Sequence, residues 1–432
     1  MTAPSETLAP PAIDGSAVYP ASATVNDRGH LEIGGCDTVE LAREFGTPAY
    51  VFDEHDLRDR ARAYTQAFTE AGGPFEVLYA SKAFPATAAY RLFREEGLAA
   101  DVASGGELYL ALRAGFAPEQ IYLHGNNKLP AELRAAFDAG VGHVIVDSLD
   151  EIERADALLD RPQRVLIRLT PDIRPATHRA VSTGQLDSKF GFSLQQAPEA
   201  IRRIAASGHL QLVGLHVHIG SQIFETAPYE RAIEALAPFA DTEPEIVDVG
   251  GGLGVAYAHG DEPPDVAAWA RLVTVATRSI FGDDVKILAE PGRALVANPG
   301  VTLYRVGSIK EIPGVRTYVA VDGGMSDNLR PMLYESRYET VIADRAGEPA
   351  DATVTVAGMH CESGDVLVRD AQLASPRVGD VLVTPATGAY GHAMANNYNG
   401  IPRPPVVFCA DGDARVVVRR ETWDDLAARD VS

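Results

Sequence analysis

Eight short apolar runs recur along the first two thirds of the chain, and stretches with helical periodicity separate them. The apolar runs lie at 76–82, 98–103, 121–124, 143–147, 165–169, 212–218, 246–249 and 286–289. Near-continuous apolar strands that alternate with helices indicate a parallel sheet covered on its outer face. Eight such units in about 250 residues predict a (β/α)₈ barrel. An open, doubly wound sheet is the alternative that the pattern leaves.

The sequence pattern changes after Pro299. Short strands with turn signals between them predict an antiparallel β domain, and its strands are expected at 302–312, 316–321, 353–357, 381–384, 406–409 and 415–421. A chain of 432 residues is also too long for one ordinary core. We therefore predict four segments: a disordered or extended lead-in at 1–22, the N-terminal part of the β domain at 23–48, the barrel at 49–299 and the C-terminal β domain at 300–432.

Charge and cysteine content exclude several classes of function. The net charge of −22 repels phosphate backbones and anionic lipid, so we expect no binding to nucleic acid or to a membrane surface. The cysteines Cys36, Cys361 and Cys409 are too few and too scattered for a disulfide framework or a zinc site, and no metal site is predicted. The N-terminus lacks the features of a signal peptide, and no apolar run is long enough to span a membrane. We therefore expect a cytoplasmic protein.

A lysine stands at the end of the first predicted barrel strand, in Val77-Leu-Tyr-Ala-Ser-Lys82-Ala-Phe-Pro85. Lysine at the end of an apolar strand is costly unless it is paired, neutralised or covalently used. Desolvation would lower the pKa of the amine and leave a nucleophile that condenses with an aldehyde. A lysine that extends its charge into solvent is the simpler alternative.

Three further strand ends carry residues that could bind a ligand or take part in catalysis. The sixth ends in His216-Val-His218, the seventh in Gly250-Gly-Gly252 and the eighth in Glu290-Pro-Gly-Arg293. Each motif also has a plain structural explanation. One of the two histidines would point inward as a hydrogen-bonded core residue and the other outward. The glycines would form a tight turn, and Glu290 with the residues after it a surface turn. Together with Lys82 they supply an amine, an aromatic plate, an anion cradle and a carboxylate, as pyridoxal phosphate requires. The combination predicts this cofactor.

The sequence resembles the alanine-racemase-like (fold type III) pyridoxal-phosphate enzymes, and among them the diaminopimelate decarboxylase family. The resemblance extends over nearly the whole chain after the lead-in. Its motifs are Tyr79-Ala-Ser-Lys82, Leu123-His-Gly-Asn-Asn-Lys128, Lys189-Phe-Gly191, His218-Ile-Gly-Ser221, Gly250-Gly-Gly252, Glu290-Pro-Gly-Arg293, Asp327-Asn-Leu-Arg-Pro-Met-Leu-Tyr334 and Cys361-Glu-Ser-Gly-Asp365. The segment Gly391-His-Ala-Met-Ala-Asn396 departs from the expected Ser-rich continuation. The resemblance implies decarboxylation of meso-2,6-diaminopimelate to L-lysine, the last step of lysine biosynthesis.

The resemblance also implies roles for individual residues. Lys82 would hold the cofactor as a Schiff base, His218 would stack on its ring, and Glu290 would pair with the ring nitrogen. The residues expected around the cofactor phosphate are Ser221, Gly251, Gly252, Gly292 and Arg293, and Tyr390 would also reach the cofactor. The residues expected to contact substrate are Arg293, Arg330, Tyr334, Glu362 and Tyr390. Cys361 would donate a proton, and Cys361 and Glu362 would come from the neighbouring subunit of a homodimer with shared active sites. Asp101 and Lys189 lie in matching stretches but have no assigned role.

Three rival functions remain at this level. A racemase on the same fold would not benefit from a strong anion such as Glu290 at the ring nitrogen. A related decarboxylase could act on ornithine, lysine or a carrier-bound amino acid. A non-catalytic pyridoxal-phosphate carrier would be a single barrel, without the β domain that carries Cys361.

Overall fold

The structure, a computed structural model, describes residues 12–173 and 188–431. The chain divides into two compact units. Unit 1 comprises the segments up to Leu57, Val255–Glu262 and from Leu295 onward, and unit 2 comprises Arg58–Gly254 and Pro263–Ala294. Among the described residues, no helix has both the length and the apolar character needed to cross a membrane.

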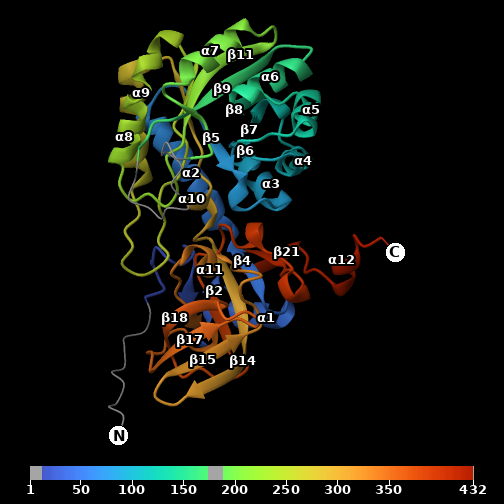
Figure 1. Ribbon diagram of the computed structural model, residues 1–432. Helices are drawn as coiled ribbons and strands as arrows, with labels where there is room; N and C mark the ends of the chain where they lie inside the picture. The colour runs from blue at the N-terminus through green and yellow to red at the C-terminus, as the bar shows by residue number, and fades with distance from the viewer. Residues whose placement is uncertain (1–11, 174–187, 432) are drawn as a thin grey trace. The chain divides into compact units, whose positions relative to one another are not determined.

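Unit 2 contains a closed barrel of eight parallel strands (Figure 1). The strands are β5 (Phe75–Ala80), β6 (Ala99–Val102), β7 (Ile121–Leu123), β8 (His143–Val146), β9 (Gln163–Thr170), β11 (Leu210–Val217), β12 (Ile246–Asp248) and β13 (Lys286–Ala289). Pairing of β13 with β5 and of β8 with β9 closes the ring. The short β10 (Phe192–Ser193) extends alongside β9. All eight predicted runs form these strands, so the predicted barrel is confirmed and the open sheet is excluded.

Helices connect successive strands and lie outside the barrel (Figure 1). They are α2 (Glu54–Ala71), α3 (Thr87–Glu95), α4 (Gly105–Ala114), α5 (Pro130–Ala139), α6 (Leu149–Leu158), α7 (Ala197–Ala206), α8 (Ala227–Glu234), α9 (Val266–Phe281) and α10 (Arg293–Val296). Local sequence begins several of them. Ser104 accepts a hydrogen bond from the Glu107 N–H at the start of α4, and Ser148 accepts one from the Glu151 N–H at the start of α6.

The interior of the barrel is filled by one buried apolar side chain from each strand. These residues are Leu78, Ala99, Tyr122, Ile145, Leu166, Val213, Ile246 and Leu288. Such a layer makes the barrel a packed core and leaves the carboxyl ends of the strands for a site. Ionisable side chains are buried toward those ends, among them Asp101, Arg168, His216, Asp248 and Glu290.

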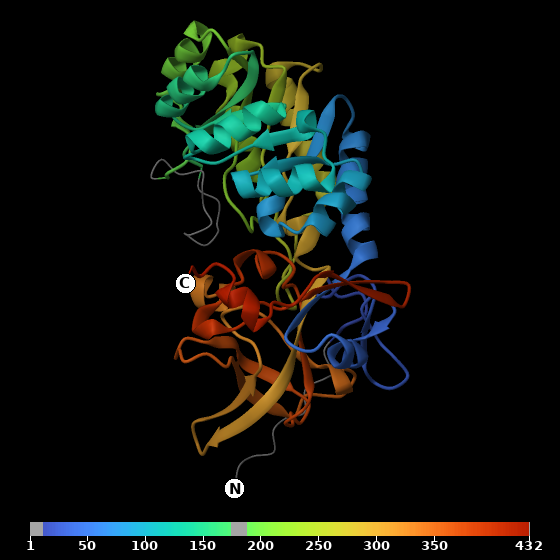
Figure 2. The same ribbon diagram turned by 90° about the vertical axis from the view of Figure 1, so that its right-hand side faces the viewer.

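Unit 1 is a mostly antiparallel β structure, as predicted. Its larger sheet contains β4 (Ala49–Asp53), β14 (Gly300–Ile312), β15 (Arg316–Val321), β16 (Val341–Ile342), β17 (Ala352–Ala357), β18 (Val366–Leu373), β19 (Val381–Thr384), β20 (Val406–Ala410) and β21 (Asp413–Val418). β14 is the long gold strand of this unit in Figure 2. The pairs β15–β17 and β4–β20 are parallel. A separate small sheet holds β1 (Thr24–Val25), β2 (Leu31–Ile33) and β3 (Cys36–Asp37), and the helices are α1 (Thr38–Glu44), α11 (Arg330–Tyr334) and α12 (Trp423–Ala427).

Two sequence-based boundaries differ from the structure. The segment at 49–53, predicted as the start of the barrel, is β4, which pairs with β14 and β20 of unit 1. Its five residues are all buried, so a strand between two partners suits them as well as a barrel strand would. The predicted lead-in at 1–22 lies in part outside the described residues, but Ile13, Val18 and Tyr19 are buried in the core of unit 1. Burial of these three apolar side chains anchors residues 12–22 to unit 1.

Candidate active site

The barrel site begins at Lys82, which lies in a short 3₁₀ turn, Ser81–Ala83, directly after β5. Ser81 helps to fix the turn because its Oγ lies 2.8 Å from the Asp101 carbonyl oxygen and 3.0 Å from Glu107 Oε2, and its single proton is shared between these two acceptors. The Lys82 side chain is 45% exposed, and its Nζ lies 3.9 Å from Asp101 Oδ2. The expectation of a desolvated amine is therefore wrong. Lys82 faces a carboxylate at the mouth of the barrel and is accessible to a ligand.

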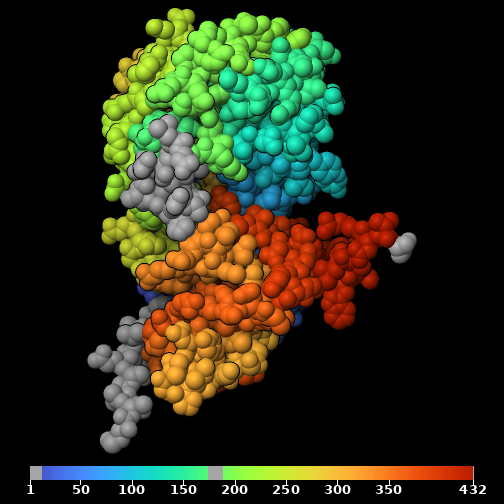
Figure 3. Space-filling model, in the orientation of Figure 1, coloured from blue at the N-terminus to red at the C-terminus, as the bar shows by residue number. Residues whose placement is uncertain are grey.

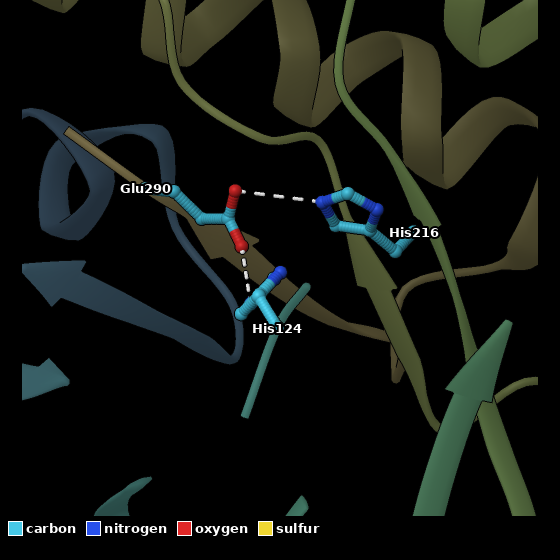
Figure 4. Close-up of side chains that lie close together, drawn as sticks. All are labelled: His124, His216 and Glu290. Carbon is cyan, nitrogen blue, oxygen red and sulfur yellow. Dashed lines mark hydrogen bonds and ion pairs between the residues drawn. The ribbon is translucent and has the colours of Figure 1, made fainter. Parts of the chain in front are cut away.

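Glu290 follows β13 directly, and two imidazoles contact its carboxylate. Its Oε1 lies 2.9 Å from His124 Nε2, and its Oε2 lies 3.4 Å from His216 Nε2 (Figure 4). Burial acts to raise the pKa of Glu290, but the two imidazoles outweigh it and hold the pKa well below its usual range. Glu290 therefore stays ionised inside the barrel.

His216 and His218 both contribute to this site, which corrects the expectation that one would point outward. Residues two apart in a strand project to the same side, so His216 and His218 are directed alike. His218 lies just past the end of β11 and accepts a hydrogen bond from the Gly251 N–H at Nδ1, at 3.3 Å. Burial, reinforced by the nearby Lys82 and Arg168 charges, lowers the pKa of His218 well below its usual value. A neutral imidazole is suited to stack on an aromatic ring.

The glycine run lies where three strand ends meet, and its composition follows from close backbone packing. A Cβ on Gly251 would lie 2.0 Å from the Glu290 carbonyl oxygen, and one on Gly252 would lie 2.0 Å from the Gly220 carbonyl oxygen. Only glycine fits either position. The packing confirms a sterically tight turn, and the anion cradle stays a prediction.

Arg293 and Ser221 are brought together as predicted. Arg293 Nε and Nη2 donate to Ser221 Oγ at 3.2 and 3.0 Å. Gly292, which precedes the arginine, packs closely on β5, because a Cβ there would lie 2.8 Å from the Ala80 carbonyl oxygen. A guanidinium paired with a hydroxyl is a suitable binding site for a phosphate.

Pyridoxal phosphate fits these residues. Glu290 is a buried carboxylate that stays ionised at the carboxyl end of the barrel, as an anion facing a protonated ring nitrogen must. Lys82 offers the amine, and Arg293 with Ser221 offers the phosphate contacts. His124, His216 and Glu290 also present ligand atoms within 4.8 Å of one another, as a metal site would. The contacts in this set pair imidazole nitrogen with carboxylate oxygen, and we interpret it as an ion-paired cluster.

The remaining predicted residues lie in unit 1, where Arg330 is the most constrained. It is buried at the start of α11, its guanidinium lies 4.4 Å from the centre of the Tyr257 ring, and Nη1 donates to the Tyr338 hydroxyl at 2.5 Å. Burial acts to lower the pKa of Arg330, but the two tyrosines outweigh it and raise the pKa. Its Nε is buried without a hydrogen-bond partner among the described residues, and this suits a carboxylate ligand.

Cys361 and Glu362 lie in an exposed turn between β17 and β18. The Cys361 N–H donates to Asn399 Oδ1 at 2.9 Å, and the Gly364 N–H donates to Glu362 Oε1 at 3.3 Å. Asp365 closes the turn: it accepts from the Met325 N–H at 2.7 Å. Tyr334 ends α11, and Tyr390 has a left-handed backbone with φ of 61°.

Sequence reasoning missed three contributors in the barrel. His124 directly follows β7, and that position was the available signal. Asp101, which had no assigned role, faces both Lys82 and His124, the latter at 3.7 Å. Arg168 is buried on β9 with its guanidinium 4.3 Å from the centre of the Phe190 ring. Lys189, also without a role, is exposed beside the same ring.

Residues 54–297 match the family model described as "Pyridoxal-dependent decarboxylase, pyridoxal binding domain". This range includes every barrel strand and the residues Lys82, His218, Glu290 and Arg293. The fold and the barrel site thus define the class, a pyridoxal-dependent decarboxylase, whose cofactor is pyridoxal phosphate.

Comparison with individual proteins narrows the class. The chain is 47% identical to the diaminopimelate decarboxylase of Bacillus subtilis over 94% of its own length and 96% of that protein. It is 43% identical to the diaminopimelate decarboxylase of Mycobacterium bovis, over 96% and 98% of the two chains. The crystal structure of the M. jannaschii diaminopimelate decarboxylase in complex with L-lysine superposes with a TM-score of 0.88, at 34% identity over 96% and 98% of the chains. The chain belongs to the diaminopimelate decarboxylase family.

Proposed function

We propose that the protein releases one carboxylate of meso-2,6-diaminopimelate as carbon dioxide and yields L-lysine, at the end of lysine biosynthesis. The observation that carries the proposal is the ionised Glu290 carboxylate, held by two imidazoles in the barrel that presents Lys82. When bound, pyridoxal phosphate with a protonated ring nitrogen supplies the electron sink that decarboxylation requires. A full anion beside that nitrogen keeps the proton in place, which a racemase would not favour.

The barrel residues divide the work of holding the cofactor. Lys82 provides the amine that binds the aldehyde, and its exposure leaves it accessible to exchange with a substrate amine. His218 covers one face of the ring as a neutral imidazole. The phosphate is held by Ser221, Gly251, Gly252, Gly292 and Arg293, and the Arg293–Ser221 contacts support this assignment.

Unit 1 supplies the substrate contacts in this proposal. Arg330 stays charged in its tyrosine cage and binds a substrate carboxylate through a buried guanidinium. Tyr334, Glu362 and Tyr390 complete the contacts, and Cys361 donates the proton that replaces the lost carboxylate. Arg293, assigned above to the phosphate, is also kept as a prediction for substrate.

Carbon dioxide release from a panel of amino acids tests the reaction. The purified protein with pyridoxal phosphate should act on meso-2,6-diaminopimelate, and at least about 10²-fold more slowly on ornithine, lysine and arginine, because only the first places a second carboxylate against Arg330. Glu290→Gln should reduce turnover about 10²-fold, on the scale of one preorganised electrostatic contact. Faster release from ornithine or lysine would reject the substrate, and unchanged turnover in Glu290→Gln would reject the role of the anion.

We further propose a homodimer in which each active site takes residues from both chains. Four exposed apolar side chains lie on segments that meet the Cys361 turn, and we name them the Cys361 patch: Met332, Leu333, Met359 and Tyr398. Their exposures of 42–52% are high for large apolar side chains. A cavity of about 920 Å³ opens beside the patch and is lined in part by Met332 and Gly364. Trp423 on α12 is 81% exposed and adds a further exposed apolar side chain to unit 1. α12 lies in the red C-terminal part of the chain that projects from the unit in Figure 3.

Mixing two inactive variants tests the shared site. Lys82→Ala lacks the amine, and Cys361→Ala lacks the proton donor, so neither variant alone should be active. Reassorted dimers should each contain one intact site and recover up to about a quarter of wild-type activity, by random pairing in a two-fold dimer. Mixed dimers without activity would show that Cys361 serves its own chain. The cytoplasmic location stays a prediction.

A further inference from the structure

His124 occupies a position between the two carboxylates of the barrel site. Its Nε2 lies 2.9 Å from Glu290 Oε1 and 3.7 Å from Asp101 Oδ1. Asp101 in turn lies 3.9 Å from Lys82 Nζ. One imidazole therefore links Glu290, the anion predicted to face the ring nitrogen, with Asp101, the anion that faces the lysine. Figure 4 shows the Glu290 side of this link.

The loop that carries His124 is held rigidly by a buried lysine. Lys128 Nζ donates to the Gly125 carbonyl at 2.8 Å, to the Ile145 carbonyl at 2.6 Å and to Glu151 Oε1 at 2.7 Å. Three acceptors satisfy all three ammonium protons. The His124 N–H also donates to the Val102 carbonyl at 2.8 Å, so the histidine is fixed between β6 and β8. A side chain positioned this firmly is able to orient another.

Electrostatics give His124 a specific effect on Glu290. Glu290 is 4% exposed, and an isolated buried carboxylate would take up a proton. The other ionisable groups that act on it are Asp101 on β6, Arg168 on β9, His216 and His218 at the end of β11, and Asp248 on β12. Burial raises the pKa of both carboxyl groups, Asp101 and Asp248, and the Glu290 charge raises them further, so that the pKa of Asp248 lies well above its usual range. Among the imidazoles, His124 makes the shortest contact, at 2.9 Å against 3.4 Å for His216.

We infer that His124 is a positioning residue: as an imidazolium shared by Glu290 and Asp101, it keeps Glu290 ionised and directed at the cofactor ring nitrogen. The inference rests on the cofactor site described above and adds a residue to it. Removal of His124 should let Glu290 take up the proton, so that the ring nitrogen of a bound cofactor loses its proton more readily.

The test uses pyridoxine 5′-phosphate, an analogue without the aldehyde, so that no bond to Lys82 forms. Its ring protonation is followed by ultraviolet absorbance during a pH titration of the saturated complex. In wild type the bound ring should stay protonated to a higher pH than in His124→Ala, with midpoints at least one pH unit apart. His124→Asn, which keeps a donor but cannot carry charge, should behave like His124→Ala. Glu290→Gln should give the same shift, and the double variant His124→Ala/Glu290→Gln no further one, because the effect passes through Glu290.

His143→Asn is the matched control, since His143 is another buried barrel histidine, on β8, whose ring stacks on Tyr122 at 4.4 Å. Its midpoint should equal that of wild type. Equal midpoints in wild type and both His124 variants would overturn the inference. Folded His124 variants that bind no analogue would also overturn it, because phosphate binding by Arg293 should persist. Failure of the wild type to bind the analogue would instead reject the cofactor site itself.

Discussion

Single residues in the barrel site work through charge compensation over short distances. Asp101 faces the Lys82 amine, His124 and His216 face Glu290, and Arg168 faces Asp147 at 3.9 Å. A buried charge is stable only when such a partner is present, so each pair is also a constraint on its neighbours. The arrangement leaves the Lys82 amine at the surface of the site, where a reactive group is useful.

Lys82→Ala should abolish covalent attachment of the cofactor without unfolding the barrel. The side chain is 45% exposed, so its loss should change the free energy of unfolding by less than about 1 kcal/mol. Borohydride reduction and peptide mass mapping should locate the pyridoxyl group on the Lys82 peptide of wild type and nowhere in the variant. An adduct on Lys128 or Lys189 would contradict the assignment.

At the scale of elements, the site depends on how closely the ends of neighbouring strands approach one another. The turns after β11, β12 and β13 pack backbone against backbone, and this packing brings His218, the glycine run and Glu290 together. The helices around the barrel fix the strands but contribute few site residues. A change in how closely these turns pack would therefore also move the site residues that they carry.

Gly251→Ala should destabilise the barrel and weaken cofactor binding together. The added Cβ would lie 2.0 Å from the Glu290 carbonyl oxygen, and backbone on both sides limits relaxation. We expect a loss of about 2 kcal/mol or more in the free energy of unfolding. Urea titration followed by Trp269 fluorescence measures it, because this tryptophan is buried on α9 against the rings of Tyr64, Phe68 and Tyr229. Gly208→Ala is the control, since a Cβ there meets no atom within 4 Å, and it should change neither property.

Protonation of His143 on β8 should make the protein less stable in acid. Burial, with the Arg164 and Lys286 charges, lowers the pKa of His143 to about 4. The unfolded chain takes up the proton near pH 6.5, so stability contributed by the neutral ring is lost as pH falls from 6.5 toward 4. At pH 5 this loss should reach about 2 kcal/mol. His143→Asn should therefore lose less unfolding free energy between pH 7 and pH 5 than wild type, measured by Trp269 fluorescence in urea. An equal loss in both proteins would contradict the depressed pKa.

At the scale of the whole molecule, the chain comprises two units that carry different sets of predicted site residues. Unit 2 holds the residues predicted to bind the cofactor, except Tyr390, and unit 1 holds Tyr390, Arg330 and the Cys361 turn. The proposed dimer gives the second set a place to act, because the Cys361 patch exposes apolar surface that a second copy would cover.

Met332→Glu should weaken the proposed dimer. A charge in an apolar contact is buried without a partner, so we expect the dissociation constant to rise at least about tenfold and activity at low protein concentration to fall with it. Light scattering after size-exclusion chromatography across a dilution series measures the change. Val315→Glu is the control, because Val315 is 74% exposed in the turn between β14 and β15, and its dimerisation should be unaffected. A dimer as stable as wild type in Met332→Glu would place the interface elsewhere.

The sequence by itself determined the eight barrel strands, because buried parallel strands are short, near-continuous apolar runs, whereas the helices between them are apolar on one face only. It also determined which residues stand at strand ends, including Lys82, Glu290 and the glycine run, since a motif needs only local order. Only the tertiary structure decided what surrounds them. The exposure of Lys82, the contact of His124 with Glu290 and the pairing of β4 with β14 and β20 all join residues distant in the chain. Periodicity within one segment carries no information about such partners, because packing between segments selects them.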